Sequence, residues 1–200
     1  MILATSNLHK VGEMRELLPG VDLEPLPDGY ESPVEDGDSF EANALIKARA
    51  AQAKLGGTVI ADDSGIEAED LGGAPGIYSA RYAGIGVGDQ VNLDKLLREV
   101  DAAGGERRAA YVCALVLIEE DGSEHVFEAR CSGQLLREER GTGGFGYDPA
   151  FVPDETGIED PRTMAELSAG EKHAISHRGK AARLLAVHLG TVAAGLPPGD

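Results

Sequence analysis

Apolar residues recur along this chain at two spacings, and each spacing predicts a different kind of element. Apolar side chains at every third or fourth position predict one buried face of a helix. This spacing occurs in four stretches, at residues 11–18, 40–55, 89–100 and 181–188. Apolar runs bounded by turn residues predict strands instead. Such runs lie at residues 1–4, 21–26, 58–61, 108–119 and 123–136.

Turn signals and the order of these elements predict the fold class. Asp121-Gly122 is typical of a hairpin, so the strands on either side of it are expected to run antiparallel. The run at residues 21–26 contains Pro25 and is expected to form an edge strand. The strand at residues 58–61 is expected to end in a sharp turn at Gly65. The predicted fold is α/β, with a long mixed sheet and flanking helices.

The length of 200 residues favours one domain. Residues 1–190 are expected to form a single two-lobed domain, and the glycine- and proline-rich residues 191–200 a flexible tail. The N-terminus lacks the basic region and the apolar core of a signal peptide. The longest apolar run, residues 109–118, is too short to cross a bilayer as a helix. No membrane association is therefore expected.

The charge balance restricts the partners of this chain. Its formal net charge is -17, with 18 basic and 35 acidic residues, which argues against broad contact with nucleic acid or an anionic membrane. A small phosphate ligand stays compatible with this charge, because a few local cations and a metal ion suffice to bind it. Cys113 and Cys131 are too few for a disulfide scaffold, so buried free thiols and a reducing, cytoplasmic location are expected.

Two adjacent acids, Asp62 and Asp63, follow the apolar run at residues 58–61, and Ser64 follows them. Buried carboxylates are costly unless a positive charge compensates them. Mg2+ is a hard cation that takes one or two carboxylates together with substrate phosphates. A solvated acidic turn is the alternative interpretation, and the acid pair alone leaves both open.

Residues 5–10 form a polar turn between the first predicted strand and the first predicted helix. The backbone donors at such a helix N-terminus favour phosphate, and Lys10 adds a positive charge. An ordinary helix cap with a surface lysine is the alternative, since the P-loop pattern is absent from the sequence. Lys47 shares a helix face with Asn43 and becomes a candidate only if that face looks toward the two acids.

Residues 141–149 set four glycines around two aromatic residues, in a chain with only 4% aromatic residues. Glycines let the backbone approach a flat ligand, on which Phe145 could stack. Asp148 could then accept a hydrogen bond from a ring N–H. The alternative places Phe145 in the core beneath a long hairpin loop.

Ser176 is expected to cap the last helix. His177 and Arg178 would then lie in its first turn, where backbone donors and the helix dipole favour anionic or carbonyl oxygens. His188, later in the same helix, is interpreted as a packed or half-exposed histidine rather than a ligand.

Together these stretches resemble a known family of enzymes, the inosine triphosphate pyrophosphatases, which act as dITP/XTP diphosphatases. The matching segments occur in the family's order and span nearly the whole chain. They are Ala4-Thr5-Ser6-Asn7 with Lys10, Ser39-Phe40 with Asn43-Ala44 and Lys47-Ala48, ADDSG at residues 61–65, LGGAPGIYSARY at 71–82, GTGGFGYDP at 141–149 and SHRG at 176–179. The segments at 71–82 and 141–149 are long and highly specific, whereas Thr5-Ser6-Asn7 alone is not.

The resemblance implies an α/β fold with two lobes around a central nucleotide cleft, and usually a homodimer. It implies Mg2+-dependent hydrolysis of deaminated purine nucleoside triphosphates (ITP, dITP and XTP) to the monophosphate and pyrophosphate, which cleanses the nucleotide pool. Asp63 and Glu35 would hold the Mg2+, and Asp63 and Lys47 would be catalytic. The substrate would be bound by Thr5, Ser6, Asn7, Leu8, His9, Lys10, Ser64, Phe145, Gly146, Tyr147, Asp148, Lys172, His177 and Arg178.

Within this set, the resemblance implies two groups. Lys10, Lys47 and Lys172 would hold the triphosphate. Phe145 would stack on the purine, and its edge would be read by His177, Arg178 and Asp148.

Two positions depart from the family pattern. Ala42 stands where a glutamate is usual, and Val34-Glu35 stands where paired acids are usual, so Glu35 is the expected second metal carboxylate. One alternative is a Maf-like pyrophosphatase that acts on pyrimidine or modified nucleotides, which the segments at 141–149 and 176–179 disfavour. The other is a non-catalytic nucleotide-binding relative, which the intact acid pair disfavours.

Overall fold

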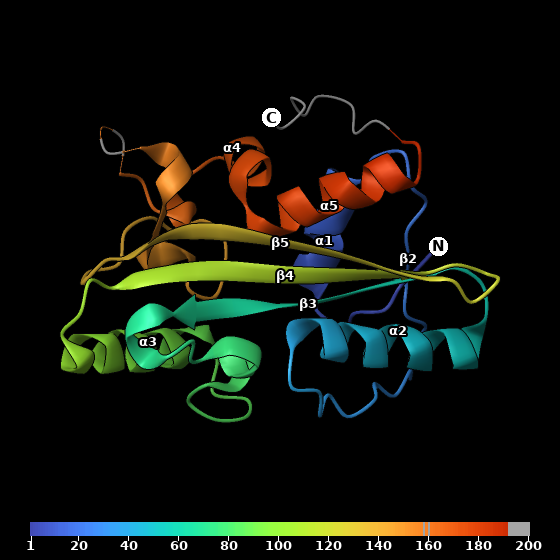
Figure 1. The fold of residues 1–200 in the computed structure, drawn as a ribbon, viewed down its shortest axis with the longest axis horizontal. Coiled ribbons are helices and arrows are strands. Elements are labelled where there is room, and N and C mark those ends of the chain that lie inside the picture. Colours follow the sequence, from blue (N-terminus) through green and yellow to red (C-terminus); the bar gives the residue numbers. More distant parts are fainter. Residues whose placement is uncertain (158, 160, 192–200) are drawn as a thin grey trace. The chain divides into compact units, whose positions relative to one another are not determined.

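The structure of the chain is a computed structural model, which describes residues 1–157, 159 and 161–191 (Figure 1). The strands are β1 (Ile2–Leu3), β2 (Glu24–Pro25), β3 (Val59–Ala68), β4 (Arg108–Ile118), β5 (Glu124–Leu135) and β6 (Phe151–Pro153). The α-helices are α1 (Leu8–Leu17), α2 (Phe40–Leu55), α3 (Asp89–Ala103), α4 (Ala169–Ile175) and α5 (His177–His188). Short 3-10 helices join several of them, including Gly76–Arg81 between β3 and α3.

The strands of the described residues form one mixed sheet in the order β2-β1-β3-β4-β5-β6. β1 pairs in parallel with both β2 and β3, whereas β6 pairs antiparallel with β5. β4 and β5 are neighbours joined by a tight turn, in which Gly122 N donates to Glu119 O at 2.9 Å, so they run antiparallel. The predicted α/β class, the mixed sheet, the hairpin and the edge position of β2 are confirmed.

The chain divides into two compact units. Unit 1 comprises residues 1–63, 113–129 and 178–200, and unit 2 comprises residues 64–112 and 130–177. The strands β3, β4 and β5 each contribute residues to both units. The central nucleotide cleft stays a prediction.

In unit 1, helices cover both faces of the sheet (Figure 1). Three alanines of α2 pack against Val59 and Ala61 of β3 on one face. α1 and α5 cover the other face, where Ile60 joins Leu115 of β4 in a second core. The two cores divide consecutive residues of β3 between them because side chains of a strand alternate between its faces.

In unit 2, a single core cluster gathers residues of α3 and of the unit's parts of β3, β4 and β5. Gly65 lets a 3-10 helix approach β3 closely, because an added Cβ would lie 2.4 Å from Ser79 Oγ and 2.6 Å from Gly76 O. Ile66 N donates to Ser79 Oγ at 2.9 Å, which fixes the helix to the strand. This close approach explains why residue 65 is a glycine.

The predicted turn at Gly65 is wrong, because β3 continues through the acids to Ala68. Polar residues ended the prediction early, although a strand whose acids meet cations can remain buried. β1 and β2 are also shorter than predicted, with two residues each. α4 and β6 were not predicted, since seven and three residues are too few to give a periodic signal.

Three further expectations concern single residues or segments. Cys113 and Cys131 are free and buried, as predicted. Among the residues that the structure describes, no helix is long and apolar enough to cross a membrane. The flexible tail predicted at residues 191–200 lies, apart from Thr191, outside the described residues.

Candidate active site

β3 carries the two adjacent acids within the strand rather than after it. Because successive side chains of a strand point to opposite faces of the sheet, Asp62 and Asp63 point in opposite directions. Asp62 meets Lys10 of α1, whereas Asp63 meets Lys47 of α2. The acid pair of the sequence is therefore two sites on opposite faces, here named the Asp62 cluster and the Asp63 cluster.

The Asp63 cluster consists of Asp63, Lys47, Glu35 and Asn43. Lys47 Nζ lies 3.2 Å from Asp63 Oδ1 and 3.0 Å from Glu35 Oε2, so one ammonium joins both carboxylates. Asn43 Nδ2 donates to Asp63 Oδ2 at 3.3 Å. Lys47 and Asn43 lie one turn apart on α2, so the helix face that they share looks toward Asp63.

The surroundings of Asp63 shift two pKa values. Burial raises the pKa of Asp63, and the like charges of Glu35 and Asp62 add to the rise, although Lys47 and Lys10 oppose it. Burial alone would lower the pKa of Lys47, but Asp63, Asp62 and Glu35 outweigh it and raise that pKa. Lys47 is therefore a stable cation, whereas Asp63 accepts a proton more readily than an exposed aspartate. The second property suits a general base.

Asn43 also positions the loop that carries Glu35. Gly37 N donates to Asn43 Oδ1 at 2.9 Å, which fixes this loop to the first turn of α2. A Cβ at Gly37 would lie 2.8 Å from both Asn43 Oδ1 and Ala42 Cβ. A larger residue at this position would push the loop, and with it Glu35, away from the helix.

The Asp62 cluster consists of Asp62, Lys10, Arg178 and Glu13. The Asp62 side chain is fully buried, and its Oδ2 lies 2.8 Å from Lys10 Nζ and 3.5 Å from Arg178 Nη2. Arg178 also forms an ion pair with Glu13. α1 supplies Lys10 and Glu13, and the first turn of α5 supplies Arg178. The charges of two acidic and two basic side chains balance one another in this cluster.

The balance of charge fixes the protonation of Asp62. Burial alone would raise its pKa, but Lys10, Arg178 and Lys47 outweigh burial and hold that pKa well below its ordinary value. Burial would likewise lower the pKa of Arg178, yet the neighbouring anionic groups, Asp62 first, raise it. Asp62 is thus an ionised anchor between two helices, and its low pKa argues against a role as a base near neutral pH.

The loop before α1 forms a helix cap in the same unit. Asn7 Oδ1 accepts hydrogen bonds from His9 N at 3.0 Å and from Lys10 N at 3.4 Å, while Asn7 N donates to Thr5 Oγ1 at 3.2 Å. The predicted site residues at positions 6–9 are exposed. The helix cap of the alternative interpretation is therefore present, but Lys10 is ion-paired with the buried Asp62 and is not a surface lysine. The cap places the positive end of the α1 dipole beside Lys10, which suits an anionic ligand.

A third polar group, the Asp148 cluster, lies in unit 2 and consists of Asp148, Lys172, Tyr111, His177 and Phe145. Lys172 Nζ lies 2.9 Å from Asp148 Oδ2 and 5.1 Å from the centre of the Phe145 ring. Phe145 N donates to Asp148 Oδ2 at 2.9 Å, and Tyr111 OH donates to Oδ1 at 3.1 Å. His177 stacks on Tyr111 with ring centres 4.7 Å apart. Asp148 thereby holds the glycine loop against α4 and β4.

The two aromatic residues of the glycine loop have different surroundings. Phe145 is half-buried and outside the core cluster of unit 2, which disfavours the alternative that placed it in the core. Tyr147 belongs to that core, and its hydroxyl donates to Ser79 O at 2.7 Å. Gly146 N donates to Asp89 Oδ2 at 2.9 Å. Phe145 is therefore the more exposed of the two aromatic rings of this loop.

Two predicted site residues are paired with buried acids. The Lys172 ammonium lies 2.9 Å from Asp148 Oδ2 in unit 2. The Arg178 guanidinium lies 3.5 Å from Asp62 Oδ2 in unit 1. Ser64 is half-buried in β3, next to Asp63.

Apart from Asp62, three residues of these clusters were not among the predicted site residues. Asn43 was noted as a neighbour of Lys47 and within a matching segment but was given no role, and its polarity on a face otherwise rich in alanine was a further signal. Glu13 lies three positions after Lys10, so helical spacing already placed it near that lysine. Tyr111 gave no signal, because an aromatic residue in an apolar strand is ordinary core packing.

The Asp63 cluster fits a hard divalent cation. The oxygens of Asp63 and Glu35 converge on one ammonium, at 3.2 and 3.0 Å, and the cluster holds one carboxylate more than it holds cations. Mg2+ prefers carboxylate oxygens and retains positions for water and phosphate. These two residues could therefore hold Mg2+.

Comparison with known proteins identifies the family. Residues 1–188 match the Ham1 family model. The dITP/XTP pyrophosphatase of Corynebacterium diphtheriae is 45% identical over 194 residues, which cover 92% of this chain and 94% of the relative. A HAM1 protein from Coxiella burnetii superimposes with a TM-score of 0.85 at 38% identity, and a dITP/XTP pyrophosphatase from Mycobacterium abscessus with 0.73 at 42%, each covering 94% of this chain and 97% of the other. The resemblance inferred from the motifs is confirmed, and the chain belongs to the Ham1 family.

Proposed function

We propose that this protein hydrolyses the deaminated purine nucleotides ITP, dITP and XTP to the monophosphate and pyrophosphate. The observation that carries the proposal is the Asp63 cluster, in which a carboxylate of raised pKa lies beside an ammonium and a second carboxylate. The substrate class is supported by a relative of 45% identity named dITP/XTP pyrophosphatase. That name also disfavours the pyrimidine-directed and the non-catalytic alternatives.

In the proposed reaction, water attacks the α-phosphorus, the bond to the β-phosphate breaks, and pyrophosphate leaves. Asp63 accepts the proton of the attacking water. Burial raises the pKa of this carboxyl, and Mg2+ held by the same group would act against that rise. Lys47 stabilises the negative charge that develops on the phosphate oxygens. Mg2+ held by Asp63 and Glu35 would supply further neutralisation of phosphate charge. Asn43 keeps both carboxylates in position.

The triphosphate would be bound in unit 1. Lys10, the exposed residues at positions 6–9 and the N-terminus of α1 form an electropositive helix start. Lys10 also neutralises Asp62 at 2.8 Å, so it is held in place before substrate arrives. Ordered cations of this kind bind phosphate without a further loss of side-chain entropy.

The base would be bound in unit 2, where Phe145 would stack on the purine. Hypoxanthine and xanthine carry a carbonyl at C6 and a proton at N1, whereas adenine carries an amino group and a bare nitrogen. Lys172 and His177 would donate to the carbonyl, and Asp148 would accept from N1. A site built to pair with one edge can reject the analogue by about ten-thousand-fold, because its own polar groups stay unpaired. ATP should therefore be a very poor substrate.

We also propose a homodimer and a cytoplasmic location. Residues 78–91 expose the large apolar side chains Tyr78, Ile85, Val87 and Val91, and exposed apolar side chains of this kind often mark an interface. Light scattering of the parent and of Ile85→Glu tests the dimer, which the substitution should weaken.

The proposed cytoplasmic location rests on the two buried thiols, Cys113 and Cys131, which suit a reducing compartment.

A pyrophosphate-release screen over ITP, dITP, XTP, GTP and ATP, with and without Mg2+, tests the proposed reaction. We expect Mg2+-dependent pyrophosphate and monophosphate from the first three substrates. A nucleoside diphosphate as the first product would place the cleavage at the terminal phosphate and overturn the proposal.

A further inference from the structure

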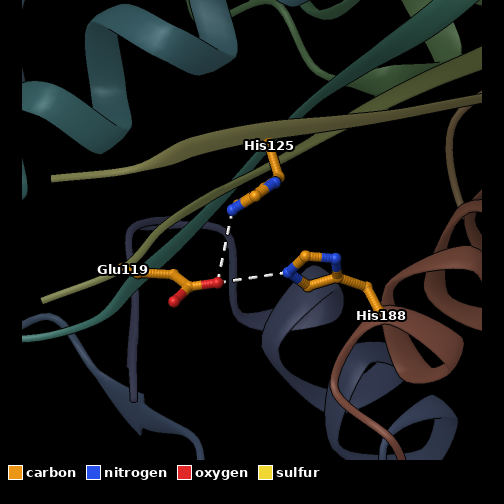
Figure 2. Close-up of side chains that lie close together, drawn as sticks. All are labelled: Glu119, His125 and His188. Carbon is orange, nitrogen blue, oxygen red and sulfur yellow. Dashed lines mark hydrogen bonds and ion pairs between the residues drawn. The ribbon is translucent and has the colours of Figure 1, made fainter. Parts of the chain in front are cut away.

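We propose that Glu119, His125 and His188 form a binding site for a zinc-class metal ion, built from residues that the proposed catalysis does not use. Glu119 follows the end of β4, His125 lies at the start of β5, and His188 is the last residue of α5. Their side chains point toward one another (Figure 2). All three belong to unit 1.

The distances suit a tetrahedral ion. Glu119 Oε1 lies 3.2 Å from His125 Nε2 and 3.2 Å from His188 Nε2, and the three ligand atoms all lie within 4.8 Å of one another. Zinc bonds of about 2.0–2.1 Å at tetrahedral angles separate neighbouring ligand atoms by about 3.3 Å. Two of the three separations already have this length, and rotation of the histidine side chains can adjust the third.

The donor types select the metal. Two imidazole nitrogens with one carboxylate oxygen are typical ligands of Zn2+, and a water molecule completes the four positions. Mg2+ prefers an all-oxygen set, so it competes poorly here. The Asp63 cluster holds carboxylate oxygens and no imidazole, and therefore has the opposite preference.

Neighbouring contacts hold the three ligands in place. Gln52 of α2 donates to Glu119 O at 2.6 Å, and Glu119 N donates to Ser123 O at 2.9 Å across the hairpin. The His188 ring packs against His125 with ring centres 4.2 Å apart, and against Phe127 at 5.5 Å. The three side chains remain 32–43% exposed, so an ion can reach them from solvent.

The local charge also favours a cation. Residues 119–124 include four acids, of which Glu124 is paired with Arg49. The chain as a whole carries -17. This field raises the local concentration of divalent cations.

The competing explanation for the cluster is a pair of hydrogen bonds, in which Glu119 Oε1 accepts an N–H from each histidine and binds no metal.

Bound metal would join the β4–β5 hairpin to the end of α5, and both elements would then open less readily. Since the ion binds the folded chain preferentially, a 100-fold excess over Kd should raise Tm by about 5–10 °C.

Calorimetric titration of the full chain with Zn2+, in slightly alkaline buffer and with Mg2+ in excess, tests the site. We expect one ion per chain in the parent, and a loss of affinity of at least about 10–100-fold in His188→Gln, in His125→Gln and in Glu119→Gln. Glu120→Gln is the matched control, because it removes an adjacent exposed acid that is not a ligand, and it should bind like the parent. Of these proteins, only the parent and Glu120→Gln should give the visible Co2+ spectrum of a tetrahedral site.

The outcomes separate the two explanations. Parent protein that binds Zn2+ no more tightly than His188→Gln would leave only the hydrogen bonds and overturn the proposal. An equal loss in Glu120→Gln would show a diffuse charge effect and would also overturn it. Pyrophosphatase activity is not the readout, so failure of the proposed reaction would leave this result unchanged.

Discussion

Asp62 and Asp63 are neighbours in one strand, yet they occupy opposite chemical environments. Asp62 is fully buried between Lys10 and Arg178, and its pKa is held low. Asp63 shares one ammonium, that of Lys47, with Glu35, and its pKa is raised. The difference arises from the pleat of the strand, which sends successive side chains to different faces. One face is electrically balanced and holds helices together, and the other has a surplus carboxylate that favours a proton or a metal ion.

The largest expected effect comes from Asp63→Asn. The variant loses the proposed base, so kcat should fall by about 10³–10⁴-fold, at the upper end of what a general base contributes. Far-UV circular dichroism and Tm should stay near the parent values, because burial already disfavours the charge of Asp63. Steady-state kinetics with ITP measure the loss. Retention of most of kcat in this variant would assign Asp63 a structural role.

Asp62→Asn should mainly lower stability, whereas Asp63→Asn should mainly lower kcat. Asp62→Asn leaves Lys10 and Arg178 facing a neutral group inside the protein, and the loss of one partner from a buried ion pair costs about 3–5 kcal/mol. Urea unfolding should report this fall in the free energy of unfolding. A variant as stable as the parent would contradict the anchoring role.

The pH dependence of stability separates the two acids further. Since the folded-state pKa of Asp62 is depressed, its contribution is present above the unfolded value of about 3.9 and is lost as pH falls below it. Parent protein should therefore lose stability on acidification below about pH 4, and Asp62→Asn should lose less over the same interval. The pKa of Asp63 is raised, so its protonation on acidification works in the opposite direction. Unfolding curves at several pH values measure both.

A smaller effect is expected in the pH profile of activity. Asp63 must be ionised to act as a base or to hold Mg2+, so kcat/KM should fall on the acid side as Asp63 takes up a proton. Lys47 lowers the pKa of Asp63, so the acid limb should move to higher pH in Lys47→Met. Lys54→Met, in the exposed last turn of α2, is the matched control and should keep the parent profile. If the acid limb of kcat/KM stays at the parent pH in Lys47→Met, a group other than Asp63 causes that limb.

The sequence predicted the helices of this site well and the strand between them poorly. Apolar spacing located α1 and α2, and their polar positions included Lys10 and Lys47. The prediction ended β3 at the acids because a polar pair usually ends a buried strand, and it therefore treated Asp62 and Asp63 as one site. Had the strand been continued through them, alternation alone would have separated them. The pairing of Asp62 with Arg178 depends on α5 returning to the same face, and spacing along one chain cannot reveal this.

The smallest expected effect is on Cys113, a reporter on the Asp62 face. Burial first, and then the charge of Asp62, raises the pKa of Cys113 to about 12. Only the thiolate reacts with iodoacetamide, so a Cys131→Ala variant, with Cys113 as its one thiol, should label slowly at pH 8 and far faster in denaturant. Adding Asp62→Asn removes one cause of the raised pKa and loosens the packing of α1 and α5, so labelling should quicken modestly. The same background with Asp63→Asn should label about as slowly as Cys131→Ala alone, because the Asp63 charge is the weaker influence and lies on the other face. If Asp62→Asn and Asp63→Asn accelerate the labelling of Cys113 equally, the two faces of β3 are not independent. The contrast between the two acids would then be contradicted.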